Sequence, residues 1–238
     1  MKIILSLIMF ISTAYGSENF SLSAMTSFQS QKIYRGAQIW EWPGMTVGVS
    51  AVIFKRLEIR GPLIDFHFFE RSNNIELDVG LRFFTDSEPM IPLEKGFLNH
   101  RNKRGDALDL LVHYKYKFGW RNLFAIGVDI NKELIEHEGS YYRPFIEFPI
   151  LPYTKLSIAA GYGSIEANKF VYGPSAISGL GHLDITLSNV LVQLPWDGII
   201  ITQFGVSYVK GQENINADYI RGNDQNNFVS TRIIWKFY

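Results

Sequence analysis

The sequence predicts an all-β fold: an antiparallel transmembrane β-barrel of about twelve strands, with ten as the alternative count. Three observations support this prediction. Apolar and polar residues alternate with a period of two along most of the chain, and aromatic residues make up 15% of it. After the first residues, no apolar run approaches the ~18 residues that indicate a membrane-spanning helix. The mean hydropathy of +0.01 is therefore reached by interleaving apolar and polar side chains.

Residues 1–16, MKIILSLIMFISTAYG, are expected to form a cleaved signal peptide. Lys2 precedes an apolar run that extends from Ile3 to Ile11, and small residues follow it. This run is about half of the ~20 residues that a membrane helix needs, so it fits a signal peptide better than an anchor. We therefore expect an exported chain with one barrel domain over residues 17–238.

The alternation is clearest over residues 74–84. Its apolar set is Ile75, Leu77, Val79, Leu81 and Phe83, and its polar set is Glu76, Asp78, Gly80 and Arg82. Successive side chains of a strand point to opposite faces, so this segment has one apolar face and one charged face. Residues 106–118, 19–29 and 154–163 show the same pattern.

A soluble sandwich and a membrane barrel can both use two-faced strands, and three features favour the barrel. The segments are long enough for a tilted crossing of the hydrocarbon layer. Their polar faces mix charges with Gly and Ser, as a lumen does. Aromatic residues gather at segment ends, where a barrel has its interfacial girdles; these are Phe83-Phe84, Tyr116 with Phe118, Tyr141-Tyr142, Tyr208, and Trp235 with Phe237.

Eleven candidate strands follow from this pattern, near 19–29, 46–54, 57–69, 74–84, 106–118, 122–130, 141–149, 154–163, 181–193, 198–209 and 228–238. Short turns alternate with long polar loops, which start at Thr85, Ser164 and Gly211. A barrel with both ends in the periplasm needs an even number of strands. Either a twelfth strand lies near 31–42, or one early segment does not span. The pattern also changes phase at Gly61-Pro62, which we interpret as a bulge.

The composition narrows the possible chemistry. The chain has no cysteine, so it has neither disulfides nor thiolate metal sites, and its 23 basic and 23 acidic residues predict no nucleic-acid partner. The five histidines follow no metal-binding spacing. The segment 161–164, GYGS, is not expected to bind phosphate because no helix is predicted after it. We predict no catalytic, cofactor-binding or metal-binding residue and no cofactor.

Two histidines were weighed as catalytic groups. His113 lies on a polar face beside Lys115 and Asp109, either as a lumenal base or as a hydrogen-bonding residue that fills the lumen, and we favour the second interpretation. His182 and Asp184 share a face, with Ser188 further along it. This set is the best candidate for a lipid hydrolase, which would need its Ser and His where lipid can reach them.

Six segments in order along the chain resemble the MipA/OmpV family, the MltA-interacting proteins of Gram-negative outer membranes. They are ENFSLSAMTSF (18–28), KIYRGAQIWEWPGM (32–45), RLEIRGPL (56–63), GDALDLLVHYKYKFG (105–119), KFVYGPSAISGLG (169–181) and RIIWKFY (232–238). The chain departs from the family pattern at residues 170–174 and in DYIRGNDQNN (218–227).

This resemblance implies a location in the outer membrane and contact with its lipids. It also implies a non-enzymatic scaffold connected with peptidoglycan synthesis and turnover, with murein hydrolases and synthases as partners. Two alternatives remain open: a small passive pore, which the charged lumenal faces indicate, and a surface adhesin, which the resemblance implies. A lipid hydrolase is a further alternative.

Overall fold

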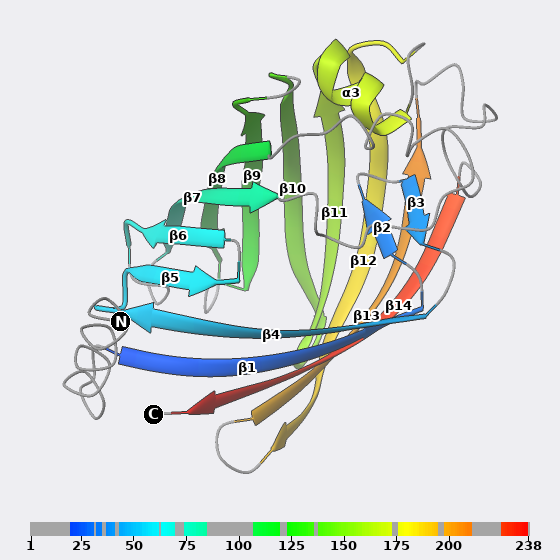
Figure 1. The fold of residues 1–238 in the computed structure, drawn as a ribbon. Helices are drawn as coiled ribbons and strands as arrows, with labels where there is room; N and C mark the ends of the chain where they lie inside the picture. Colours follow the sequence, from blue (N-terminus) through cyan, green and yellow to red (C-terminus); the bar gives the residue numbers. More distant parts are fainter. Residues whose placement is uncertain are drawn as a thin grey trace, which may run out of the picture.

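The computed structural model describes residues 20–30, 32–34, 37–40, 43–61, 63–69, 74–84, 107–119, 123–135, 138–172, 176–194, 198–210 and 225–237. Within them, twelve strands close into one antiparallel barrel, which confirms the predicted fold class and strand count (Figure 1). The predicted signal peptide, residues 1–16, lies outside the described residues. No helix in the described part of the chain has the length and apolarity needed to cross a bilayer.

The barrel follows the chain order apart from one excursion between its first two strands. Its strands are β1 (Phe20–Gln29), β4 (Gly44–Ile53), β5 (Leu57–Arg60), β6 (Leu63–His67), β7 (Ile75–Phe84), β8 (Ala107–Phe118), β9 (Phe124–Glu133), β10 (Ser140–Leu151), β11 (Thr154–Gly163), β12 (Gly179–Leu194), β13 (Gly198–Val209) and β14 (Gln225–Phe237). β14 pairs with both β13 and β1, and β1 pairs with β4. The ring is therefore closed, as a sheet in lipid requires.

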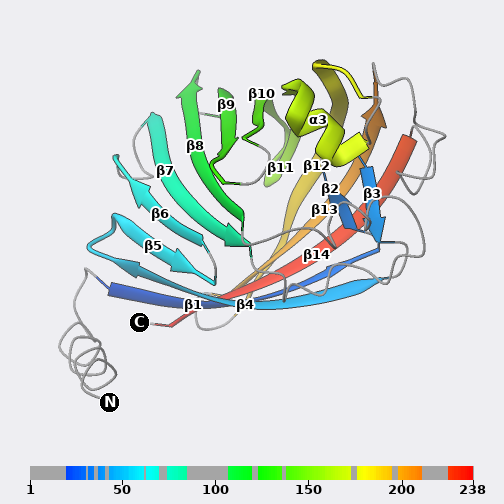
Figure 2. The same ribbon diagram turned by 45° about the horizontal axis from the view of Figure 1, so that its top comes forward.

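The excursion corrects one of our expectations. The described residues of segment 31–42, which are 32–34 and 37–40, do not supply the twelfth strand of the barrel. Instead, β2 (Lys32–Tyr34) and β3 (Ala37–Trp40) pair with each other in a separate two-stranded sheet. Both lie at the loop end of the barrel, near β14 (Figure 2).

The twelfth strand comes from residues 57–69, which form a hairpin where we had predicted one bulged strand. β5 has four residues and β6 has five, and Arg60 pairs with Leu63 across the turn. Gly61 begins this turn with φ of +53°, a conformation that glycine adopts easily. β5 pairs with β4 only at Ser50–Ile53, so the hairpin forms a low section of the wall.

The predicted faces are confirmed over the described strands. Apolar residues of the predicted outer sets are exposed, among them Leu81, Phe83, Tyr116 and Phe118. Buried polar residues come from the opposite phase; they include Ser27, Glu58, His67, Asp109, Asn131, His182, Ser207 and Ser230. A continuous exposed apolar wall around a polar interior is the arrangement of a membrane barrel.

The aromatic residues at strand ends mostly face outward. Tyr116 stacks on Phe118, which in turn stacks on Phe124, with ring centroids 6.1 and 5.9 Å apart. Tyr142 is exposed as a girdle residue should be. The prediction was wrong for Tyr141, which points into the lumen and is buried, because neighbouring residues of a strand cannot share a face.

A helix that we did not predict follows β11. α3 (Ile165–Tyr172) begins one residue after β11 ends at Gly163, where we had expected a loop. Ser164 caps it, since its Oγ accepts a hydrogen bond from the Ala167 N–H at 3.3 Å. Ala167, Asn168, Val171 and Tyr172 are buried, so one side of α3 packs into the mouth of the barrel (Figure 2).

Candidate functional site

Two cavities lined by described residues lie in the lumen, on opposite sides of the β5–β6 hairpin. A cavity of about 400 Å³ lies against β6–β10, and a cavity of about 590 Å³ lies against β1, β4, β5, β13 and β14. Arg60 and His67 line both of them. We call them the charged cavity and the serine cavity, after the side chains described below.

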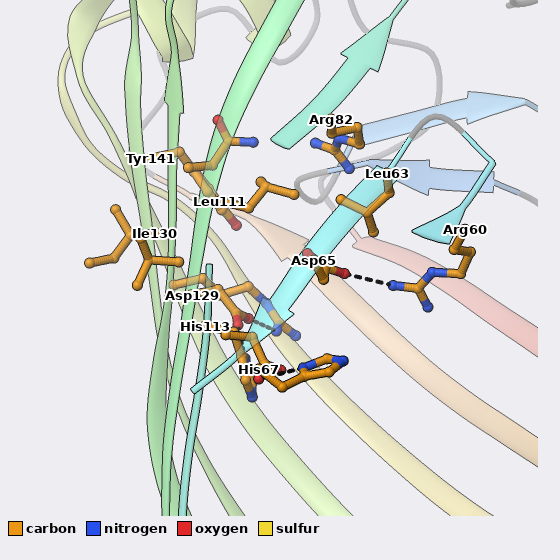
Figure 3. Close-up of a pocket in the computed structure, with 14 residues that line it drawn as sticks. Arg60, Leu63, Asp65, His67, Arg82, Leu111, His113, Asp129, Ile130 and Tyr141 are labelled. Carbon is orange, nitrogen blue, oxygen red and sulfur yellow. Dashed lines mark hydrogen bonds and ion pairs between the residues drawn. The ribbon is translucent and has the colours of Figure 1, made fainter. Parts of the chain in front are cut away.

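The charged cavity is lined by three arginines, three aspartates and two histidines (Figure 3). Their charges are paired along the wall. His67 Nδ1 lies 2.7 Å from Asp78 Oδ1, and Arg60 Nη2 lies 3.5 Å from Asp65 Oδ2. Both contacts join side chains of neighbouring strands, so these pairs lie along the wall of the charged cavity.

The pairs continue around the wall. Asp129 accepts from His113 Nδ1 at 2.6 Å and from Arg143 Nη1 at 3.0 Å, and Arg143 Nε also reaches Asp184 at 3.3 Å. Further bonds join Arg82 to Asp109 at 2.8 Å, Lys115 to Glu147 at 2.7 Å, and Lys117 to Glu76. These groups form one belt of alternating charge from β5 to β12, and opposite charges held this way stabilise each other's ionised forms.

Small residues make the long pairs of this belt possible. Lys115 on β8 reaches Glu147 on β10 past β9, which presents Ala125 and Gly127 to the lumen. A Cβ on Gly127 would collide with the Tyr114 carbonyl and the Phe145 ring. Glycine at this position is therefore required by the packing of its neighbours.

A buried histidine joins α3 to the barrel wall. His182 is 1% exposed, and its Nε2 lies 3.1 Å from Tyr141 Oη while its Nδ1 lies 3.2 Å from Tyr172 Oη. Asp184 lies 3.3 Å from the same Nε2. Gly161 provides the space for the imidazole, since a Cβ there would overlap its ring.

The structure does not bring the hydrolase candidates together. His182 and Asp184 are in contact, but both face the lumen, away from lipid. Ser188 lies six residues further along β12, roughly 20 Å away at the usual rise per residue, and it accepts a hydrogen bond from Gln203 Nε2 at 3.1 Å. Ser207 contacts Asp184 rather than the imidazole, so no serine is placed for His182 to activate in the described residues.

His113 occupies the lumenal position that the sequence predicted. It is bonded to Asp129, lies 3.8 Å from Glu76, and stacks on Phe145 with ring centroids 5.7 Å apart. Partners on three strands hold its ring, which fits the hydrogen-bonding role that we favoured. Among the described residues, no group of three or more His, Asp or Glu side chains is arranged to hold a metal ion.

The serine cavity has a different lining. Small hydroxyl residues come from β1 and β4, and Ser23 Oγ lies 2.7 Å from Ser50 Oγ. Apolar Met25, Val52, Ile199 and Ile234 also line it, together with Lys55, Glu58, Arg60 and Arg232.

Several of these residues were not singled out from the sequence. Arg143, Asp129, Glu58 and Arg60 all lie in the inward phase of their strands, and this phase was the available signal. The sequence does not show which inward side chains of different strands come within contact distance. The lumenal partners therefore became evident only from the registers.

A scan against protein-family models gave no match, and a search of the curated proteins gave none either. Solved structures of similar shape are outer-membrane proteins. An outer-membrane channel from Pseudomonas putida F1 has 9% identity over 93% of this chain and 97% of its own, with a TM-score of 0.48. A bacterial polysaccharide outer membrane secretin has 12% identity over 92% and 99%, with a TM-score of 0.41. The outer membrane protein OprD from Pseudomonas aeruginosa has 11% identity over 93% and 66%, with a TM-score of 0.39.

Proposed function

We propose that this chain is an outer-membrane barrel that acts as a small passive channel for polar solutes. The observation that supports this most directly is the lumen: its charges pair along the wall and leave cavities of about 400 and 590 Å³ that share Arg60 and His67. A lumen filled by side chains would instead place charge pairs across the barrel. α3 packs against the mouth on the β10 and β11 side and narrows the entrance there.

Planar-bilayer recording tests the channel. The purified chain, folded into zwitterionic lipid, should give discrete conductance steps. Gly48→Trp should reduce the step size, because the residue faces the lumen and a Cβ there meets only the Met25 methyl, at 3.8 Å. Val47→Trp is the matched control on the outer face, where Val47 is 66% exposed. Absence of steps from well-folded protein, or equal steps from both variants, would overturn the proposal.

A scaffold connected with peptidoglycan turnover is the second candidate. The six ordered segments that resemble the MipA/OmpV family favour it, and its partners would be murein hydrolases and synthases. Crosslinking of intact cells followed by purification of the barrel tests it. Recovery of the barrel without any murein enzyme would refute the scaffold and leave the channel unaffected.

Neither candidate includes a catalytic step. We expect an unchanged membrane lipid profile after His182→Ala, because the side chain is buried among Tyr141, Tyr172 and Asp184. A specific loss of one lipid product in that variant would instead indicate an enzyme.

A further inference from the structure

Arg232 differs from the other lumenal arginines in the described part of the chain. Arg60, Arg82 and Arg143 each contact a carboxylate, at 3.5, 2.8 and 3.0 Å. Arg232 has no carboxylate partner among the described residues, and the cationic Arg60 lines the same cavity. We propose that the serine cavity binds an organic anion with an apolar body, and that Arg232 holds the negative charge.

The position of Arg232 in the wall supports this assignment. It lies on β14, paired with Ser27 of β1 on one side and Ile201 of β13 on the other. Ser27 is buried, and neither neighbour carries a charge. A partly buried guanidinium beside another cation is unfavourable unless an anion joins them. Since guanidinium groups bind carboxylates in a two-pronged geometry, a carboxylate is the natural ligand here.

The remaining lining defines the rest of the ligand. Met25, Val52, Ile199 and Ile234 present apolar surface to the same space, while Ser21, Ser23 and Ser50 supply hydroxyl groups. The carboxylate of Glu58, which also lines the cavity, lies 3.4 Å from His67 Nε2. A volume of about 590 Å³ is typical of sites for small organic molecules. These features fit a monocarboxylate with a short aliphatic or aromatic body.

Titration calorimetry with octanoate tests the site. The full mature chain is placed in nanodiscs of zwitterionic lipid, with octanol and octyltrimethylammonium as uncharged and cationic analogues. Octanoate should bind, octanol should bind more weakly, and the cation should not bind. Arg232→Gln should weaken octanoate binding by about tenfold or more, the expected loss of one charge-assisted contact.

Two further variants keep the test decisive. Lys155→Gln removes the same charge from a lumenal position that does not line the cavity, so octanoate should bind it as tightly as the parent chain. Ile234→Trp leaves Arg232 in place but fills the cavity, and it should also abolish binding. This second variant decides the question if Arg232→Gln fails to fold.

Several results would overturn the proposal. Equal affinities for octanoate and octanol would show that the charge is not recognised, and unchanged binding by Ile234→Trp would place the ligand elsewhere. Weaker octanoate binding in phosphatidylglycerol nanodiscs would assign the site to an anionic lipid rather than to a soluble solute. The site does not require conduction, so a barrel that binds octanoate but gives no conductance steps would refute the channel alone.

Discussion

The two sides of the lumen are built in different ways. From β5 to β12, charged side chains form a continuous belt, and glycines such as Gly127 and Gly161 leave space that neighbouring rings occupy fully. Along β13, β14, β1 and β4, the cavity lining is mostly apolar residues and serines, and Gly48 is nearly uncrowded. One barrel thus combines a side whose charged groups are paired with one another and a side whose cavity lining carries few charges, although Gly205 on β13 is crowded by the Phe228 ring.

The largest expected loss of stability comes from charges placed on the outer face. These substitutions test whether the two sides of the barrel differ only in the lumen. We call β5 to β12 the charged sector, and β13, β14, β1 and β4 the serine sector. Val112→Arg on β8 places a charge on the outer face of the charged sector, and Val47→Arg on β4 does so in the serine sector. Each should destabilise the barrel by ~2–4 kcal/mol if the residue lies near the bilayer midplane, because the charge is buried in lipid. Urea unfolding in lipid vesicles measures both. A cost confined to the charged sector would show that the outer faces differ as well.

The substitutions Gly161→Ala on β11 and Gly48→Ala on β4 compare one crowded and one uncrowded glycine of the two sides. Gly161→Ala should cost ~1–3 kcal/mol through overpacking, since its Cβ would lie 2.7 Å from Tyr141 Oη and overlap the His182 ring. Gly48→Ala is the matched variant, and it should leave the unfolding free energy unchanged or slightly raised. Gly80 on β7 is crowded in the same way, because a Cβ there would collide with Asp65.

Loss of single polar contacts should give the smallest difference. Asp129→Asn weakens the bonds to His113 and Arg143 and should cost about 1 kcal/mol, because the side chains are partly exposed to water in the lumen. Ser23→Ala removes one hydroxyl bond to Ser50 and should cost no more than about half of that. High salt should reduce the Asp129 effect and leave the Ser23 effect unchanged. Equal salt dependence would contradict the division into sectors.

The sequence predicted the long strands well because one signal, the period of two, determined both their extent and their faces. β11 and β13 match the expected bounds, and β7 and β8 differ from them by one residue at the start. The charged lining followed from the same signal. The pairing of Arg143 with Asp184 did not, because it depends on β11 presenting small residues between β10 and β12.

The errors have a common physical cause. A bulge and a tight hairpin both change which of two alternating positions faces outward. Ile59 and Ile64, which are an odd number of residues apart, therefore face outward in either case. Alternation alone could not separate the two at Gly61, and only the closed register did. The helix α3 was missed because eight residues are too few for a clear helical period, although Ser164 followed by Glu166 was an available cap signal.

The β5–β6 hairpin also affects the surrounding bilayer. Strands of four and five residues, tilted as in other barrels, rise only ~10–13 Å, compared with an apolar band of about 25 Å around a typical barrel. We therefore expect the lipids beside this sector to thin locally, at a cost of a fraction of a kcal/mol per Å of mismatch. Because this mismatch is on one side of the molecule only, we expect the barrel to prefer thin regions of the membrane. We also expect its axis to tilt toward the β5–β6 hairpin.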